Sequence, residues 1–168
     1  MTKKERQTGA RAGSELECSL VTPVLVIGVG NILLGDEGVG VHIIRAMQLR
    51  ERLTGVELLD GGTVTFELLD SLADRDKVII IDAVKGGSQP GTVYRFTPND
   101  IEMQSHNSFS LHQISLLEML KMAELTDCIP RNIVILGIEP KVVDWGLELS
   151  QEVAAQVPKV IELVLGEL

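Results

Sequence analysis

Residues 24–44 read VLVIGVGNILLGDEGVGVHII, and this stretch decides the fold class. It opens with a short, mostly branched apolar run, Val24–Val29, which is typical of a buried strand. Gly28 and Gly30 then indicate a tight turn. The apolar residues that follow the next glycines recur at helical spacing, which predicts a helix over Val39–Arg50. The stretch therefore predicts a strand, a loop and a helix.

Two adjacent acidic residues, Asp36 and Glu37, stand at the predicted junction of loop and helix. In an open α/β sheet this junction lies at the carboxyl end of a strand, where ligands bind. The commoner interpretation makes Asp36 a helix N-cap and Glu37 a first-turn acid favoured by the helix dipole. A dinucleotide fingerprint is disfavoured, because it needs glycine where Leu33 stands and because two carboxylates would repel a pyrophosphate. The loop suits a cation better than an anion.

The rest of the chain alternates between strand and helix patterns. Further strands are predicted at 56–63, 77–83, 92–96 (an edge strand) and 132–138, and helices at 65–72, 110–125 and 150–168, the last bent at Pro158, with an irregular segment at 99–109. Four branched apolar residues at 78–81 indicate a central parallel strand covered on both faces. The order predicts a single three-layer α/β/α domain with a mostly parallel, twisted sheet of about five strands, of the phosphorylase/hydrolase-like kind.

Composition narrows the class of protein. The chain has 168 residues and a formal net charge of −9, which argues against nucleic acid as a partner. No apolar run is long enough to span a membrane. Cys18 and Cys128 are isolated, so a disulfide framework or a thiolate metal site is not expected, and the pattern suits a reducing, cytoplasmic environment. Residues 1–22 are polar and lack the apolar core of a signal peptide, so we expect a disordered tail before a domain at 23–168.

Four candidate site residues fall just after predicted strands or at a helix start: Glu37, Asp60, Asp82 and His112. Right-handed crossovers gather the carboxyl ends of parallel strands on one edge of the sheet, so these side chains are expected to face one cleft. Carboxylates combined with an imidazole suit zinc, nickel, iron or manganese. The first turn of a helix also favours a neutral imidazole at His112.

Each candidate also has a purely structural interpretation. Asp82 could bind loop amides at a strand end, Asp60 could belong to an Asp-Gly-Gly turn, and His112 could be a solvated helix residue. The other two histidines receive no role. His42 is expected on the solvent side of the first helix, and His106 lies in a polar segment.

Five motifs carry a family resemblance, in order and with compatible spacing. They are GVGNILLGDEGVG at 28–40, DGGT at 60–63, DA at 82–83, SLHQ at 110–113 and GIEP at 137–140. From about residue 24 to 165 the chain resembles the hydrogenase maturation endopeptidases. The resemblance implies that Glu37, Asp82 and His112 contact a metal, and that Asp60 lies near the site with a less certain role. The tail is the one departure from the pattern.

The resemblance also implies a reaction. Family members remove a C-terminal extension from the large-subunit precursor of a nickel–iron hydrogenase after nickel insertion, and they recognise the nickel that the substrate holds. The chain is thus expected to be a metal-dependent endopeptidase of aspartic or metallo type, monomeric and cytoplasmic, with no permanently bound metal. Glu37, Asp82, His112 and Asp60 would be its catalytic group, and Glu37 and Asp60 are the candidates for a general base.

Two other kinds of protein remain open at this point. One is a nucleotide-binding α/β module, against which Leu33 and the acidic loop argue. The other is a nickel-binding chaperone without peptidase activity, because the same ligands would serve both functions.

The predicted tail gives a first test. A chain that starts at Pro23 should keep the melting temperature and the activity of the full chain, because residues 1–22 are polar and precede the first buried strand. Thermal melts and a cleavage assay on both forms check this. A lower melting temperature for the shorter chain would show that the tail packs on the domain.

Overall fold

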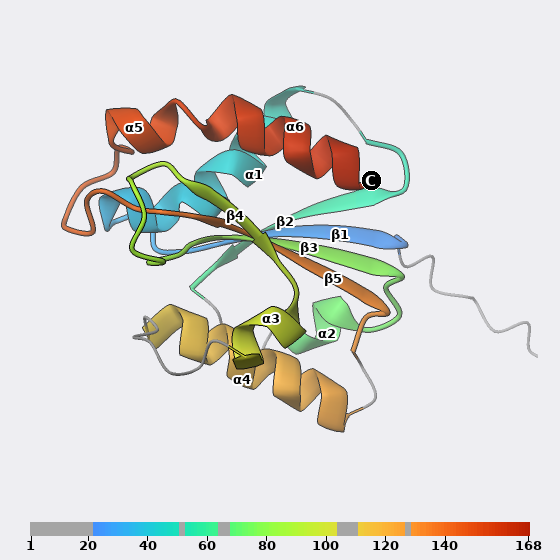
Figure 1. Ribbon diagram of the computed structural model, residues 1–168. Coiled ribbons are helices and arrows are strands. Elements are labelled where there is room, and N and C mark those ends of the chain that lie inside the picture. Colours follow the sequence, from blue (N-terminus) through green and yellow to red (C-terminus); the bar gives the residue numbers. More distant parts are fainter. Residues whose placement is uncertain (1–21, 51–52, 64–67, 104–110, 127–128) are drawn as a thin grey trace, which may run out of the picture.

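The computed structural model describes residues 22–50, 53–63, 68–103, 111–126 and 129–168. It confirms an α/β fold of three layers, in which helices cover both faces of one sheet (Figure 1). The strands are β1 (Val24–Val29), β2 (Val56–Gly62), β3 (Lys77–Ala83), β4 (Val93–Phe96) and β5 (Asn132–Ile138). The helices are η1 (Gly35–Gly38), α1 (Val39–Arg50), α2 (Leu69–Leu72), α3 (Pro98–Met103), α4 (Leu111–Leu125), α5 (Gln151–Ala154) and α6 (Val157–Glu167).

The sheet has the strand order β2-β1-β3-β5-β4. Neighbouring strands are parallel except at one edge, where β4 pairs antiparallel with β5. The edge position of this strand was predicted from the sequence, and its direction was not. The four parallel strands all end on the left in Figure 1, where the chain turns into loops. This carboxyl edge is the place at which an open α/β sheet binds ligands.

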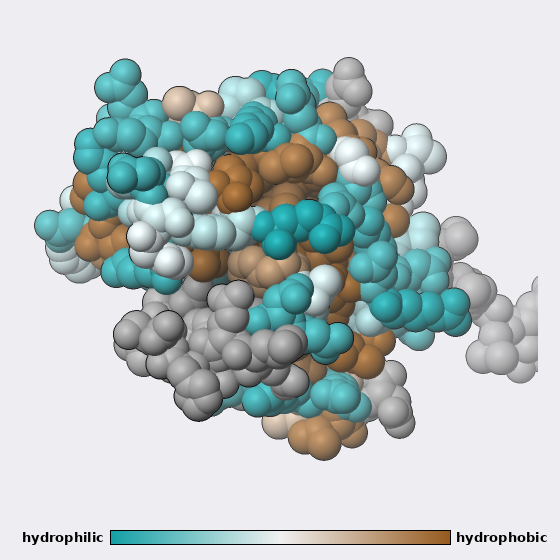
Figure 2. All heavy atoms as spheres, viewed as in Figure 1, coloured by the Kyte–Doolittle hydropathy of each residue, from teal (hydrophilic) through white to brown (hydrophobic). Residues whose placement is uncertain are grey.

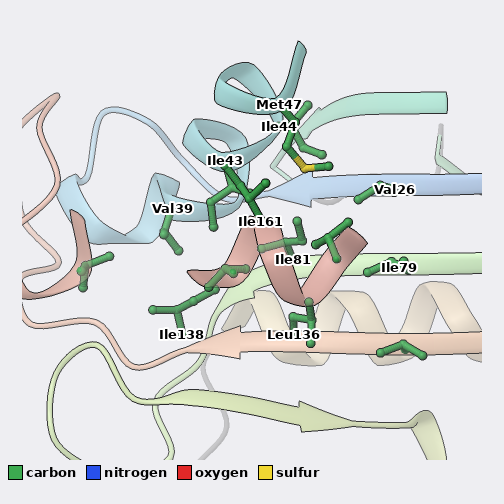
Figure 3. Packing of buried hydrophobic residues seen from close by; sticks show 14 residues of the cluster. Val26, Val39, Ile43, Ile44, Met47, Ile79, Ile81, Leu136, Ile138 and Ile161 are labelled. Atoms are coloured by element: carbon green, nitrogen blue, oxygen red, sulfur yellow. The ribbon is translucent and has the colours of Figure 1, made fainter. Parts of the chain in front are cut away.

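Alternation along the strands divides the core into two layers. Side chains such as Val26, Ile79 and Ile81 pack under α1 and α6 (Figure 3), whereas Ile27 and Ile80 point to the other face, towards α2 and α4. Both faces of the central strands are therefore buried, which explains their continuous apolar sequence. In the described part of the chain, we find no helix that is long and apolar enough to cross a membrane.

A glycine contact brings the first helix close to the sheet. A Cβ atom on Gly40 would overlap the carbonyl oxygens of Ile81 and Val29. Gly30 has a φ of 129°, a conformation that residues with a Cβ rarely adopt. These positions let α1 start directly over β1 and β3, and they fix the short loop that carries Asp36 and Glu37.

Two predicted elements differ from the structure. Part of the segment expected to be irregular forms α3, because Asp100 Oδ2 accepts hydrogen bonds from the backbone N–H and the hydroxyl of Thr97 and so caps a short helix. The final helix is broken before Pro158 rather than bent at it. Proline is well suited to the first turn of a new helix, and α6 accordingly begins at Val157.

Several predictions concern residues outside the described ranges. They include the tail up to residue 21, both cysteines, His106, and the proposed capping box, since Ser110 is not described. Thr22, the last residue of the predicted tail, is described, and its carbonyl oxygen accepts a hydrogen bond of 2.6 Å from Arg75 Nη1. The ordered domain therefore includes Thr22.

Gly40→Ala should destabilise the domain by about 3 kcal/mol, because the new methyl group would overlap two backbone oxygens that cannot move without disturbing the sheet. Gly166→Ala in α6 is the matched control. No atom lies within 4 Å of its added Cβ, so it should be neutral or gain about 0.5 kcal/mol of helix propensity. Urea unfolding of the three proteins measures both effects. Equal stability of the two variants would contradict the proposed close contact.

Candidate functional site

The carboxyl edge of the sheet is built from three loops and the start of one helix. The loops follow β1, β3 and β5, and α4 also begins at this end of the molecule (Figure 1). Three buried acidic residues, Asp36, Asp82 and Glu139, belong to these loops or to the strand ends beside them. Their hydrogen bonding separates the residues that build the edge from those that are available for chemistry.

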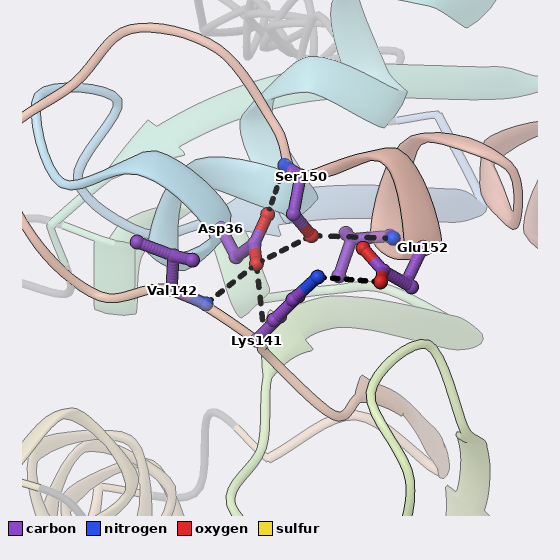
Figure 4. A network of polar contacts seen from close by, with 6 residues as sticks. Asp36, Lys141, Val142, Ser150 and Glu152 are labelled. Carbon is purple, nitrogen blue, oxygen red and sulfur yellow. Dashed lines mark hydrogen bonds and ion pairs between the residues drawn. The ribbon is translucent and has the colours of Figure 1, made fainter.

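Asp36 has an exposed fraction of 0% and holds a distant segment in place (Figure 4). Its carboxylate accepts hydrogen bonds from the backbone N–H groups of Lys141, Val142 and Ser150 at 2.7–2.9 Å, and from the Ser150 hydroxyl at 2.8 Å. Burial alone would raise its pKa, but these hydrogen bonds together lower it. The expectation that Asp36 caps a helix is wrong, because Leu34 occupies the N-cap position and Asp36 binds across to the other loop.

The loop after β1 and the loop between β5 and α5 (residues 139–150, here the β5–α5 loop) are joined along their backbones as well. Leu34 and Gly146 form a parallel bridge, with hydrogen bonds from Gly35 N to Gly146 O and from Gly146 N to Leu33 O at 2.8 and 3.0 Å. Asp36 N also donates to Val142 O. The first loop and the β5–α5 loop therefore form one rigid body.

Glu139 plays a similar part for the loop after β3. Its Oε2 accepts hydrogen bonds from the Tyr94 hydroxyl and from the backbone N–H groups of Gly86 and Ser88. Burial raises the pKa of this carboxyl, but the hydrogen bonds lower it more. Sequence reasoning assigned Asp36 to the wrong structural role and gave Glu139 no structural role. The signal for Glu139 was its position directly after a buried strand and before a proline.

Asp82 is different, because it is buried without enough hydrogen-bond donors. Its exposed fraction is 1%, and Oδ1 accepts one hydrogen bond of 2.8 Å from Ala83 N. Oδ2 is buried and has no hydrogen-bond partner among the described residues. Burial raises its pKa to about 7, and the negative charge of nearby Glu37 adds to the shift. The structure therefore places Glu37 close enough to Asp82, at the carboxyl edge, for its charge to act on that carboxyl.

His112 lies in the first turn of α4, at the end of the molecule where β3 ends. Strand alternation points Asp82 to the face of the sheet that α4 covers, since Ile80 packs there. The position of the His112 imidazole lies outside the described part of the structure, so its meeting with the two acids stays a prediction. Among the side chains that are described, no three His, Cys, Asp or Glu groups are close enough to hold a metal ion.

Asp60 does not join Asp82 and Glu37 in the described structure. It lies near the end of β2 on the face covered by α1, where Oδ2 forms an ion pair of 2.9 Å with Arg45 and Oδ1 accepts a hydrogen bond from Gly62 N. The turn interpretation of Asp60 therefore has direct support, and its catalytic role stays a prediction.

His42 does not face the solvent as expected. The ring is half-buried, and its Nε2 is buried without a hydrogen-bond partner among the described residues. Burial lowers its pKa, as does the positive charge of Arg45, while a hydrogen bond to the backbone of Leu147 opposes them. A neutral histidine thus lies between α1 and the β5–α5 loop.

An open, mostly parallel sheet carries at its carboxyl edge two acids that interact electrostatically, one of them short of hydrogen-bond donors, and such an α/β protein can hold a cation or exchange a proton. The chain belongs to the hydrogenase maturation protease family, whose model matches residues 41–167. That segment includes Asp82 and His112, whereas Glu37 lies before it.

Relatives of known name agree with this assignment. The chain is 37% identical to the hydrogenase 2 maturation protease of Escherichia coli K12 over 147 residues, which cover 86% of this chain and 90% of that protein. Its fold matches the solved structure of the hydrogenase maturating endopeptidase HybD from E. coli with a TM-score of 0.79 and 36% identity, covering 86% and 91% of the two chains. HybD from Thermococcus kodakarensis matches with a TM-score of 0.72 and 31% identity, over 85% and 97%.

These findings confirm the family and the protease function that the motifs indicated. They give no support to the nucleotide-binding module or to the chaperone without peptidase activity. Since the matched relatives are named proteases, we treat the acidic pair at the carboxyl edge as the candidate active site.

The raised pKa of Asp82 predicts how stability depends on pH. The pKa is about 7 in the folded protein against a usual value of 3.8. Between these values the folded state binds a proton that the unfolded state releases, so this residue makes the free energy of unfolding fall as the pH rises from about 4 to 7. Asp82→Asn removes this contribution. It should stabilise the protein at pH 8 by on the order of 2–4 kcal/mol, and by little at pH 4.

Urea unfolding of wild type and Asp82→Asn at a series of pH values measures this difference. Other carboxyls have lowered pKa values and contribute to the pH dependence with the opposite sign; they include Asp36, Glu139 and Glu167. Their contributions to the free energy of unfolding are the same in both proteins and cancel in the difference. A stability difference that does not change with pH would mean that Asp82 is ionised throughout.

Proposed function

We propose that this protease removes the C-terminal extension of a nickel–iron hydrogenase large-subunit precursor after nickel has been inserted, and that it recognises the nickel held by that substrate. Glu37, Asp82 and His112 would contact the metal. The observation that carries the proposal is the buried, donor-poor carboxyl of Asp82 beside Glu37. We further propose that the protein acts as a monomer in the cytoplasm.

The chemistry of the pair fits a transient cation. Burial raises the pKa of Asp82 to about 7 and the negative charge of Glu37 adds to the shift, so part of the Asp82 carboxyls are protonated near neutral pH. A divalent cation would favour the ionised carboxylate, and its binding would release that proton. Asp82 Oδ2 lacks a hydrogen-bond partner among the described residues, so it is available as a ligand.

A ligand set of two carboxylates and one imidazole suits a metal that arrives with the substrate. It contains no thiolate, which a protein usually employs to retain a transition metal, and it leaves coordination positions open for groups of the precursor. When bound, the nickel would fix the position of the scissile bond and polarise groups close to it. The rigid pairing of the first loop with the β5–α5 loop would keep Glu37 in place for this contact.

The geometry also favours one of the two candidate bases. Asp60 is held by Arg45 on the α1 face of the sheet, so it would have to break an ion pair before it could accept a proton at the site. Glu37 lies near enough to Asp82 for its negative charge to raise the pKa of that carboxyl. We therefore propose that Glu37 accepts a proton from the attacking water and that Asp60 supports the end of β2.

Glu37→Gln and His112→Ala should each lower cleavage of nickel-loaded precursor by orders of magnitude without unfolding the protein, because each removes a contact to the metal that positions the substrate. Asp60→Asn is the matched carboxylate control and should retain most of the activity. Gel or mass-spectrometric detection of the shortened precursor, with thermal melts of each variant, measures the effects. Cleavage by His112→Ala at the wild-type rate would remove the histidine from the mechanism.

Precursor without nickel separates substrate recognition from general proteolysis. It should remain uncut by the wild-type protein under conditions in which the nickel-loaded form is processed. If the nickel-loaded precursor binds but never loses mass, the chaperone alternative is favoured instead.

A further inference from the structure

The β5–α5 loop exposes apolar side chains that the fold does not use. Trp145 has an exposed fraction of 81% and Leu147 of 64%, and Val142 and Val143 are also exposed. Leu33 of the first loop lies beside them, since its carbonyl accepts a hydrogen bond from Gly146. We call these five residues the apolar loop patch. Figure 2 shows apolar atoms at the left end of the view, where Figure 1 places this loop.

The patch is presented on a rigid support. Asp36 ties both ends of the segment by four hydrogen bonds, and the backbone bridge between Leu34 and Gly146 fixes its middle. Trp145 N donates to its neighbour Asp144 Oδ1 at 2.7 Å, which adds a local restraint. Rigid aromatic side chains lose little conformational freedom on binding, and tryptophan is enriched among residues that dominate binding energy.

The patch is also continuous with the candidate active site. Asp36, which anchors the loop, directly precedes Glu37 in the chain, and both loops leave the carboxyl edge of the sheet. The patch and the two acids therefore belong to the same edge of the sheet. The side chains around the patch are acidic, since Asp144 and Glu148 are exposed and Lys141 is engaged by Glu152 at 2.5 Å.

We propose that the apolar loop patch is a docking surface for the folded body of the substrate precursor, separate from the contacts that hold the scissile segment. The inference rests on the proposed function of the neighbouring site. The partner surface would present an apolar depression with basic side chains around it. Trp145 would fill the depression, and docking would orient the precursor so that its metal faces Glu37 and Asp82.

Two other occupants fit the patch less well. A stable protein pair buries roughly 800 Å² on each partner, and five side chains on two loops are too few to hold a second copy of the chain on their own. The precursor would add its contacts at the active site to those at the patch. An anionic membrane surface calls for basic residues around the apolar ones, whereas this patch is surrounded by acids.

Trp145 is the only tryptophan in the chain, so any signal from a tryptophan label comes from this side chain alone. Protein labelled with 5-fluorotryptophan should give a single ¹⁹F NMR resonance. Addition of unlabelled, nickel-loaded precursor should shift this resonance. A shift that instead follows the concentration of the protease alone, or that appears with phosphatidylserine vesicles in the absence of precursor, would overturn the proposal in favour of a second copy or a membrane.

Kinetics then separate docking from chemistry. Trp145→Ala should raise the KM for nickel-loaded precursor by at least about tenfold, with kcat nearly unchanged, and Trp145→Phe should restore most of the affinity. Leu125→Ala is the control. Leu125 is 80% exposed as well, but it lies at the far end of α4, away from the carboxyl edge, and its loss should leave KM unchanged. Thermal melts should show that all three variants remain folded.

The possible failures can be told apart. If the wild-type protein does not process nickel-loaded precursor, the proposed function itself is wrong. If the wild type and Trp145→Ala process it with the same KM, the active site stands and the docking surface does not. A fall in kcat alone for Trp145→Ala would also overturn the proposal, because it would place the tryptophan in the reacting geometry and not in docking.

Discussion

The buried carboxylate of Asp36 is the interaction on which the functional edge of this molecule depends. It gathers four hydrogen bonds from a segment more than a hundred residues further along the chain. Each bond to an ionised group contributes more than an ordinary one, and loss of the set would leave a charge buried without partners. The carboxylate therefore joins the first and last parts of the domain, and the residue after it, Glu37, acquires a defined position from the same contact.

Three buried acids near one edge thus have two kinds of surroundings. Asp36 and Glu139 are surrounded by hydrogen-bond donors, and each keeps a lowered pKa while it holds a loop. Asp82 receives one hydrogen bond from Ala83, and its pKa rises to about 7. Saturated carboxylates make the frame rigid, whereas an unsatisfied one can respond to a proton or a cation. The number of hydrogen-bond donors around each buried carboxyl therefore distinguishes the acids that hold loops from the acid that can react.

Much of the fold could be predicted because its strands are buried on both faces. The four branched apolar residues of Val78–Ile81 are typical of the centre of a parallel sheet, whereas the close contact at Gly40 became evident only in the structure. The break before α6 was harder to place, because the apolar spacing continues across it. For the site, Asp82 and Glu37 were predicted together, but Asp36 was misread. Adjacent acids look alike in a sequence, and their difference depends on backbone donors that only the folded β5–α5 loop supplies.

The bond network of Asp36 has a consequence for biosynthesis. Its partners, Lys141 to Ser150, leave the ribosome long after the first strand and helix have been made, and β5 is needed to deliver them. Contacts of such large sequence separation form late, because a long chain segment must be closed to make them. A nascent chain that lacks this segment has Glu37 on an unanchored loop. The candidate site therefore takes the shape described above only after residues 141–150 have been translated and have folded against Asp36.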